Sequence, residues 1–147
     1  MHRGTAAAMS SSLRSAGARQ ASLAEVYLPA GQPERAVIES RRANELVPHG
    51  ASLRVLGIAH EALGDLPTSA SRFEAGIEFF KARGAESDEA ELLWHLGRVR
   101  RLLGDDNGAR KALFAAMIRY RRLGYAEADQ VLAEISYVTE VLTQQDA

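Results

Sequence analysis

The apolar positions of this 147-residue chain recur at the spacing of an α-helix. Between residues 92 and 103 leucine and valine stand three or four positions apart, and large apolar residues do the same between 113 and 120. This spacing gathers apolar side chains on one helical face, whereas a half-buried strand needs strict alternation, which the sequence lacks. The pattern predicts an all-α fold with helices at about 16–28, 33–47, 50–63, 66–83, 88–103, 106–123 and 126–143.

A short motif occurs twice along the chain at a fixed distance. Leu56-Gly57 is followed by Leu63-Gly64-Asp65, and the same residues return 40 positions later as Leu96-Gly97 and Leu103-Gly104-Asp105. A fainter copy begins at Leu23-Ala24. Self-similarity at a fixed period indicates a repeat architecture in which each copy forms the same small supersecondary unit.

Each unit is predicted to be two helices joined by a tight turn. Gly64 and Gly104 follow the first helix, where the backbone must adopt a left-handed conformation that only glycine enters without strain. Asp105 is suited to cap the next helix through its carboxylate. Ser87, followed by acidic residues, is expected to cap the helix over 88–103 in the same way.

The units resemble tetratricopeptide repeats. The family pattern has Leu-Gly or Leu-Ala in the first helix, Gly at the turn, then small and aromatic residues in the second helix and a final Pro. The matching residues are Leu23, Ala24, Tyr27, Gly31, Ala36, Ala43 and Pro48 in the first unit, Leu53, Leu56, Gly57, Gly64, Ser69, Phe73 and Gly76 in the second, and Leu93, Leu96, Gly97, Gly104, Ala109, Leu113 and Ala116 in the third.

The resemblance implies a right-handed α-solenoid of antiparallel helix pairs. Gly57 and Gly97 would let paired helices approach closely. Residues 17–147 are expected to form a single domain, with repeats at about 17–49, 50–89 and 90–124, a capping helix at 126–143, and a flexible tail or partial helix at 1–16. The tail has the composition of a transit peptide, but a frayed bacterial terminus or the remnant of a helix is the preferred interpretation.

The resemblance also implies a function, since this family binds peptides or helices in a groove lined by the first helix of each pair. We therefore expect a non-catalytic protein-interaction module. The 40-residue spacing resembles repeats in bacterial transcription regulators and signalling ATPases, so a regulatory or sensor fragment of such a protein is the alternative. Carried over by position, the groove residues are Ser22, Glu25, Arg54, Val55, Ile58, Glu61, Trp94, His95, Arg98 and Arg101.

Two features of this groove face qualify the expectation. Trp94 beside arginines has the composition of a binding hot spot, but it also adjoins a core position and can equally be buried between helices. The co-chaperone members of the family clamp a terminal carboxylate with basic and amide side chains. That interpretation is disfavoured, because the matching positions are Ala21, Glu25, Val55, Glu91 and His95.

Charge is unevenly distributed behind a net charge of −1. Residues 92–122 carry +6, and the acidic segments 61–91 and 123–147 carry −5 each. Alternating blocks do not suit a general polyanion binder, so nucleic acid is not an expected partner. The basic block either binds an acidic partner or a second copy of the chain, or simply pairs with Asp105, Asp106 and nearby acids. Its members are Arg98, Arg100, Arg101, Arg110, Lys111, Arg119, Arg121 and Arg122.

Catalytic chemistry finds little support in the sequence. There is no cysteine, which removes thiolate chemistry and disulfides, and no phosphate loop or zinc motif is present. Two histidines, His60 and His95, are too few ligands for a metal site. No apolar run is long enough to cross a bilayer. We expect a cytoplasmic protein without a cofactor or metal, whose partner is a protein or peptide and which does not act on membranes.

Overall fold

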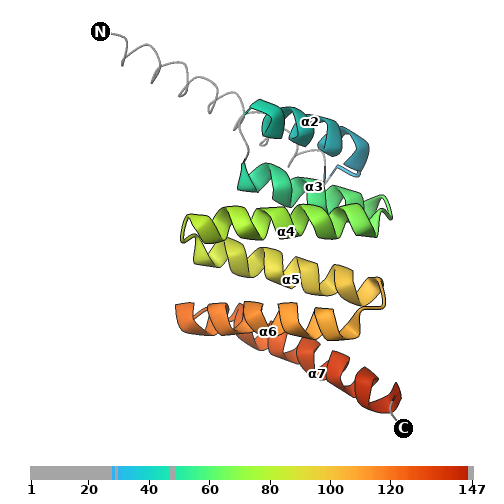
Figure 1. Cartoon of the computed structure of the whole chain (residues 1–147), viewed down its shortest axis with the longest axis vertical. Helices are drawn as coiled ribbons and strands as arrows, with labels where there is room; N and C mark the ends of the chain where they lie inside the picture. The colour runs from blue at the N-terminus through green and yellow to red at the C-terminus, as the bar shows by residue number, and fades with distance from the viewer. Residues whose placement is uncertain (1–27, 29, 47–48, 146–147) are drawn as a thin grey trace. The chain divides into compact units, whose positions relative to one another are not determined.

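The computed structural model of the chain describes residue 28, residues 30–46 and residues 49–145, and this part contains six α-helices and no strand. The predicted tail at 1–16, the predicted helix at 16–28 apart from Leu28, and the predicted groove residues Ser22 and Glu25 lie outside the described residues. The helices are α2 (Pro33–Leu46), α3 (Gly50–Ala62), α4 (Leu66–Ala82), α5 (Glu86–Leu102), α6 (Asp106–Leu123) and α7 (Glu127–Gln145) (Figure 1). The all-α prediction is confirmed, and the helix boundaries differ from the predicted ones by at most two residues.

The chain divides into two compact units, Met1–Asp65 and Leu66–Ala147. In the first unit α2 packs against α3. In the second unit α4 packs against α5, α5 against α6, and α6 against α7 (Figure 1). The boundaries of the repeats stay a prediction.

The turns follow the glycines that the repeat picks out. Gly64 and Gly104 have φ angles of 80° and 84°, in the left-handed region. Asp105 caps α6, because its carboxylate accepts a hydrogen bond of 2.9 Å from the backbone N–H of Gly108. Both predictions are confirmed.

The predicted cap at Ser87 is wrong. Helix α5 already begins at Glu86, and its N-cap residue, Ala85, makes no side-chain capping hydrogen bond. The turn at Gly84, where the N–H of Ala85 donates to the carbonyl of Phe80, brings the chain directly into the new helix. Ser87 therefore lies inside the first turn of the helix rather than before it.

The core of the first unit lies between α2 and α3 and contains Ala36, Val37, Val55, Leu56 and Ala59. Val55, predicted to line the groove, is 0% exposed in this cluster. Its side chain is therefore packed in the core and is not available to a partner, which corrects the prediction for this residue.

The core of the second unit is built by α5, α6 and α7. The contact between α5 and α6 depends on Gly97, because a Cβ atom there would lie 2.7 Å from the Cγ and Cδ2 atoms of Leu113. The close approach predicted at this glycine is confirmed. The buried cluster comprises Ala90, Leu113, Ala116, Met117, Tyr120, Ala128, Val131, Ile135 and Val138.

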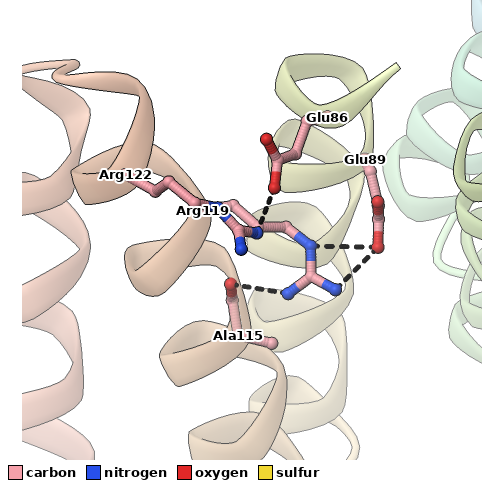
Figure 2. Close-up of polar contacts among 5 residues, drawn as sticks. All are labelled: Glu86, Glu89, Ala115, Arg119 and Arg122. Atoms are coloured by element: carbon pink, nitrogen blue, oxygen red, sulfur yellow. Dashed lines mark hydrogen bonds and ion pairs between the residues drawn. The ribbon is translucent and has the colours of Figure 1, made fainter. Parts of the chain in front are cut away.

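Ion pairs join α5 to α6 along one side (Figure 2). Arg119 donates from Nε to Oε1 of Glu89 at 2.9 Å, and its Nη2 lies 2.8 Å from the same oxygen. The Nη1 atom of Arg119 donates to the carbonyl of Ala115 at 3.0 Å, and Arg122 pairs with Glu86. These contacts hold the two helices in register, since each pair bridges residues at least 30 positions apart.

Part of the basic block forms ion pairs within the protein, as one of its two interpretations expected. Four of its members, Arg98, Arg100, Arg119 and Arg122, pair with the glutamates Glu134, Glu74, Glu89 and Glu86 of neighbouring helices. Pairing with Asp105 and Asp106 was expected because they are close in sequence, but Asp105 is used as a helix cap. Packing of helices against each other decides which charges meet.

Candidate functional site

Side chains of α5 and α7 lie together on one face of the second unit, which we call the α5–α7 face. On α5, the residues Glu91, Trp94, Arg98 and Arg101 follow at intervals of three and four, so they share one side of the helix. Two pockets lie on this face. One, of about 580 Å³, is lined by Arg101, Asp106, Ala133, Glu134, Tyr137, Val138 and Val141; the other, of about 320 Å³, by Ser87, Asp88, Glu91, Tyr120, Tyr125 and Glu127.

An ion pair between α5 and α7 lies on the same face. The Arg98 guanidinium donates from Nε to Glu134 Oε1 at 3.1 Å and from Nη2 to the same oxygen at 2.6 Å. Its Cζ atom also lies 4.6 Å from the centroid of the Trp94 ring, within the range of a cation–π contact. The charge of Arg98, which was predicted to line the groove, is thus neutralised within the protein.

Trp94 combines the two roles that the sequence left open. It is partly buried, packs against the core of the second unit, and meets Tyr120 edge to face with ring centroids 6.0 Å apart. Its indole N–H is buried and has no hydrogen-bond partner within the described ranges. Trp94 therefore mainly packs against the core under the α5–α7 face, and other side chains supply the exposed surface of that face.

The larger pocket offers apolar contacts with a cationic rim. Tyr137 is 57% exposed, and the Cζ atom of Arg101 lies 5.6 Å from its ring centroid. Val138 and Val141 line the same pocket. An apolar side chain of a partner could be buried here while Arg101 donates to a carbonyl or carboxylate group.

The smaller pocket, which we call the acidic pocket, contains three carboxylates, Asp88, Glu91 and Glu127, beside the rings of Tyr120 and Tyr125. The two ring centroids are 6.2 Å apart. Burial above all, and then the negative charges of Glu91 and Glu127, raise the pKa of Tyr120 to about 12. The Tyr120 hydroxyl therefore keeps its proton at neutral pH and can donate a hydrogen bond.

His95, predicted to line the groove, has contacts that give it a packing role. Its ring stacks on Phe73 with centroids 5.1 Å apart and an interplanar angle of 8°, and its Nε2 lies 3.8 Å from Glu91 Oε1. His60 belongs to the other unit, where its Nδ1 lies 3.7 Å from Asp65 Oδ2. Across the described residues, no three His, Asp or Glu side chains are placed to hold a metal ion.

The remaining predicted groove residues, Arg54, Ile58 and Glu61, are partly buried on α3 in the first unit. Continuation of the binding surface onto α3 stays a prediction. The residues that the structure does bring together all belong to the second unit: Trp94, Arg98 and Arg101 of the predicted set, with Glu134, Tyr137 and Val141 from α7.

The α7 residues were missed because the segment 126–143 was interpreted only as a cap. A signal was nevertheless present. The buried positions of α7 each follow a buried position of α5 by 39 residues, which pairs Glu89, Leu92, Leu96 and Val99 with Ala128, Val131, Ile135 and Val138. In that register Tyr137 corresponds to Arg98, so α7 repeats the burial pattern of α5.

None of the described helices is long and apolar enough to cross a lipid bilayer. No protein-family profile matches the sequence, and no curated protein is significantly similar to it.

Solved structures do share the architecture. The type III secretion translocator chaperone SycD of Yersinia enterocolitica superposes with a TM-score of 0.73 and 17% identity, covering 86% of this chain and 84% of its own. The TPR2AB domain of yeast Sti1, solved in complex with pHSP90, gives a TM-score of 0.71 and 16% identity, covering 95% of this chain and 50% of its own. The chain therefore has the helical-repeat fold of the tetratricopeptide repeat proteins.

Proposed function

We propose that the chain is a non-catalytic protein-interaction module that binds a peptide or helix of a partner protein on the α5–α7 face. The observation that carries the proposal is the pairing of an exposed aromatic ring, Tyr137, with an apolar pocket of about 580 Å³ beside it. Aromatic residues next to arginine at the centre of a concave surface are typical of binding hot spots. The likeness of the fold to protein-binding repeats supports the same class of function.

The geometry also suggests how a partner would be held. The Arg98–Glu134 ion pair fixes α7 against α5, so the face is organised before binding. A preformed surface loses less conformational entropy on association than a flexible one. Arg101 makes no ion pair within the described chain, which leaves its guanidinium able to donate to a partner's backbone.

Replacing Tyr137 and Arg101 together by alanine should weaken peptide binding at least about thirtyfold, the effect of losing a hot spot of roughly 2 kcal/mol. Peptides are first selected from a phage-displayed random library on the immobilised wild-type protein, and affinities are then measured by fluorescence polarisation. Ile38→Ala with Arg41→Ala is the matched control, since it removes an exposed apolar and an exposed arginine side chain from α2. Equal affinity of the selected peptides for both double variants would contradict the assignment.

We also propose that the chain self-associates through the outer sides of α6 and α7. On α6, Arg110, Phe114, Ile118 and Arg121 form a stripe whose two apolar members are about half exposed. Within the described chain neither arginine has a side-chain partner, unlike the four paired arginines of the basic block. A pocket of about 480 Å³ lies beside the stripe, lined by Arg110, Lys111, Phe114, Ile135 and Thr139.

The outer side of α7 complements this stripe in charge. Asp129 and Glu140 are exposed near its two ends and Leu132 lies between them. Since α6 and α7 are antiparallel neighbours, Arg121 lies at the Asp129 end and Arg110 at the Glu140 end. A two-fold axis running parallel to the helices would place α6 of each copy over α7 of the other and join opposite charges twice.

A charge-swap experiment tests this self-association. Arg110→Glu with Arg121→Glu, or Asp129→Arg with Glu140→Arg, should each convert the dimer to a monomer in analytical ultracentrifugation, and the fourfold variant should restore the dimer. High salt should weaken the wild-type dimer, because the pairs lie at the rim. A wild-type protein that sediments as a monomer at roughly 100 μM, the range of weak interfaces, would refute it.

A further inference from the structure

An asparagine followed by a glycine stands in the first turn of α6. Asn107 is exposed, and the backbone N–H of Gly108 donates to the Asp105 carboxylate at 2.9 Å. In an unfolded chain this dipeptide is chemically reactive, because glycine has no side chain to hinder the approach of its backbone nitrogen to the preceding side chain. A reactive dipeptide is therefore held here in a defined local structure.

The reaction that this dipeptide permits is deamidation. The backbone nitrogen of Gly108 loses its proton and attacks the side-chain carbonyl carbon, Cγ, of Asn107. A bond forms between this nitrogen and Cγ, the bond from Cγ to the side-chain nitrogen breaks, and ammonia leaves after taking a proton from the solvent. Water then opens the cyclic imide at either carbonyl carbon and gives aspartate or isoaspartate, so water is the only co-reactant.

The helical conformation keeps the reacting atoms apart. Asn107 lies inside α6, where the backbone nitrogen of the next residue is held in the helix and the side chain points away from the axis. Closing the imide ring requires the ψ angle of Asn107 to leave the helical region. The reaction therefore needs the first turn of α6 to open.

Asp105 holds this turn closed. Its Oδ1 atom accepts from the N–H of Gly108, and its backbone carbonyl accepts from the N–H of Ala109 at 2.9 Å. The first of these bonds uses the N–H whose nitrogen would attack, so it opposes both the reorientation of that nitrogen and the loss of its proton. The negative charge of the carboxylate also disfavours a second negative charge on the nitrogen beside it.

The same contact explains why glycine stands at position 108. A Cβ atom there would collide with the Asp105 carboxylate. This capping geometry therefore requires a residue without a side chain after Asn107, and that residue is the one that hinders deamidation least. The cap both creates the reactive dipeptide and restrains it.

We infer that Asn107 is a site of spontaneous deamidation, and that its rate is set by opening of the first turn of α6, which the Asp105 carboxylate keeps closed. Isoaspartate adds a methylene group to the main chain, so the capping hydrogen bond from Gly108 cannot re-form in the same geometry. The altered turn lies at the edge of the larger pocket, which Asp106 lines. The site does not depend on the proposed function.

The test is incubation of the full-length chain in slightly alkaline buffer, with deamidation of Asn107 followed over time by peptide mass spectrometry. The folded protein should react at least about tenfold more slowly than the same chain unfolded in urea, because the native state must first open locally. Equal rates in the folded and unfolded chain, or no reaction in the unfolded chain, would overturn the inference.

Variants identify the group that keeps the turn closed. Asp105→Ala should speed deamidation at least about fivefold, the effect of losing a helix cap. Asp105→Ser restores a capping oxygen and should react at close to the wild-type rate. Asp106→Ala is the matched control, because it removes the same charge from the adjacent residue, which does not cap the helix. Equal acceleration by Asp105→Ala and Asp106→Ala would show that nearby charge controls the rate, and would overturn the role of the cap.

Leu113→Ala separates local opening from global unfolding. Leu113 is buried in the core of the second unit and takes no part in the cap, so its truncation destabilises the unit elsewhere. Deamidation of Asn107 should stay at the wild-type rate in this variant, because only the first turn of α6 has to open. An acceleration as large as that of Asp105→Ala would mean that the reaction proceeds from the globally unfolded chain, and would overturn the inference.

Discussion

Replacing Arg119 with leucine should lower the free energy of unfolding of the second unit by about 3 kcal/mol. The carboxylate that this change would leave behind belongs to Glu89, which is 6% exposed and whose Oε1 atom accepts from Arg119 Nε at 2.9 Å. A buried charge that loses its partner cannot recover the hydration it gave up on folding. Water reaches the Arg119 guanidinium, which places the effect at the lower end of the range for buried pairs.

Urea unfolding followed by tryptophan fluorescence measures this effect, because Trp94 is the single tryptophan and lies in the second unit. Lys81→Leu on α4 of the same unit is the matched control; its side chain is exposed and unpaired among the described residues, so the expected change is below about 0.5 kcal/mol. The double variant Glu89→Leu with Arg119→Leu should regain most of the stability. Equal losses in the single and double variants would show that the ion pair is not the cause.

Replacing Gly97 with leucine should be destabilising by a similar amount, about 3 kcal/mol. The Cβ atom alone would lie 2.7 Å from two side-chain atoms of Leu113 and 3.3 Å from the carbonyl oxygen of Ala109. Leu113 is fully buried, so it has no free space into which to move. The helices would have to separate, which would open the core of the second unit. The higher helix propensity of leucine offsets less than about 1 kcal/mol of this cost.

A double-mutant cycle tests the steric origin of the effect. Truncating Leu113 to alanine removes the atoms that the new side chain would meet, so Gly97→Leu should cost much less in the Leu113→Ala background than in the wild type. Gly97→Ala should have an intermediate effect. Additive losses from Gly97→Leu and Leu113→Ala would contradict a direct contact between these positions.

Local features of the fold could be predicted from the sequence. The helices follow from apolar spacing, the turns at Gly64 and Gly104 from the left-handed conformation that glycine tolerates, and the cap at Asp105 from a carboxylate within reach of a nearby N–H group. Each depends on interactions within about one helical turn. The Ser87 cap failed although it is local too, because the turn at Gly84 starts the helix two residues earlier than the capping pattern requires.

Features that join helices could not be predicted in the same way. Val55 was placed in the groove although it belongs to the core, since a shift of one residue rotates a side chain by about 100° around the helix. Arg98 was expected to line the groove, and its guanidinium is paired with Glu134, 36 residues away. Nothing in the local sequence around Arg98 indicates that partner.

The sequence by itself determined the helices, the tight turns and the repeat of helix pairs, because these depend on periodicity and on backbone preferences of single residues. Only the tertiary structure decided which charges pair, that Trp94 supports the face rather than dominating it, and that α7 contributes Tyr137 to the candidate site. Which side chains meet between two helices depends on how far each helix is shifted along its axis and on how it is rotated about that axis. A shift of one residue therefore changes every contact between them. The α5–α7 face of the second unit is therefore formed by packing, while its helices were already encoded locally.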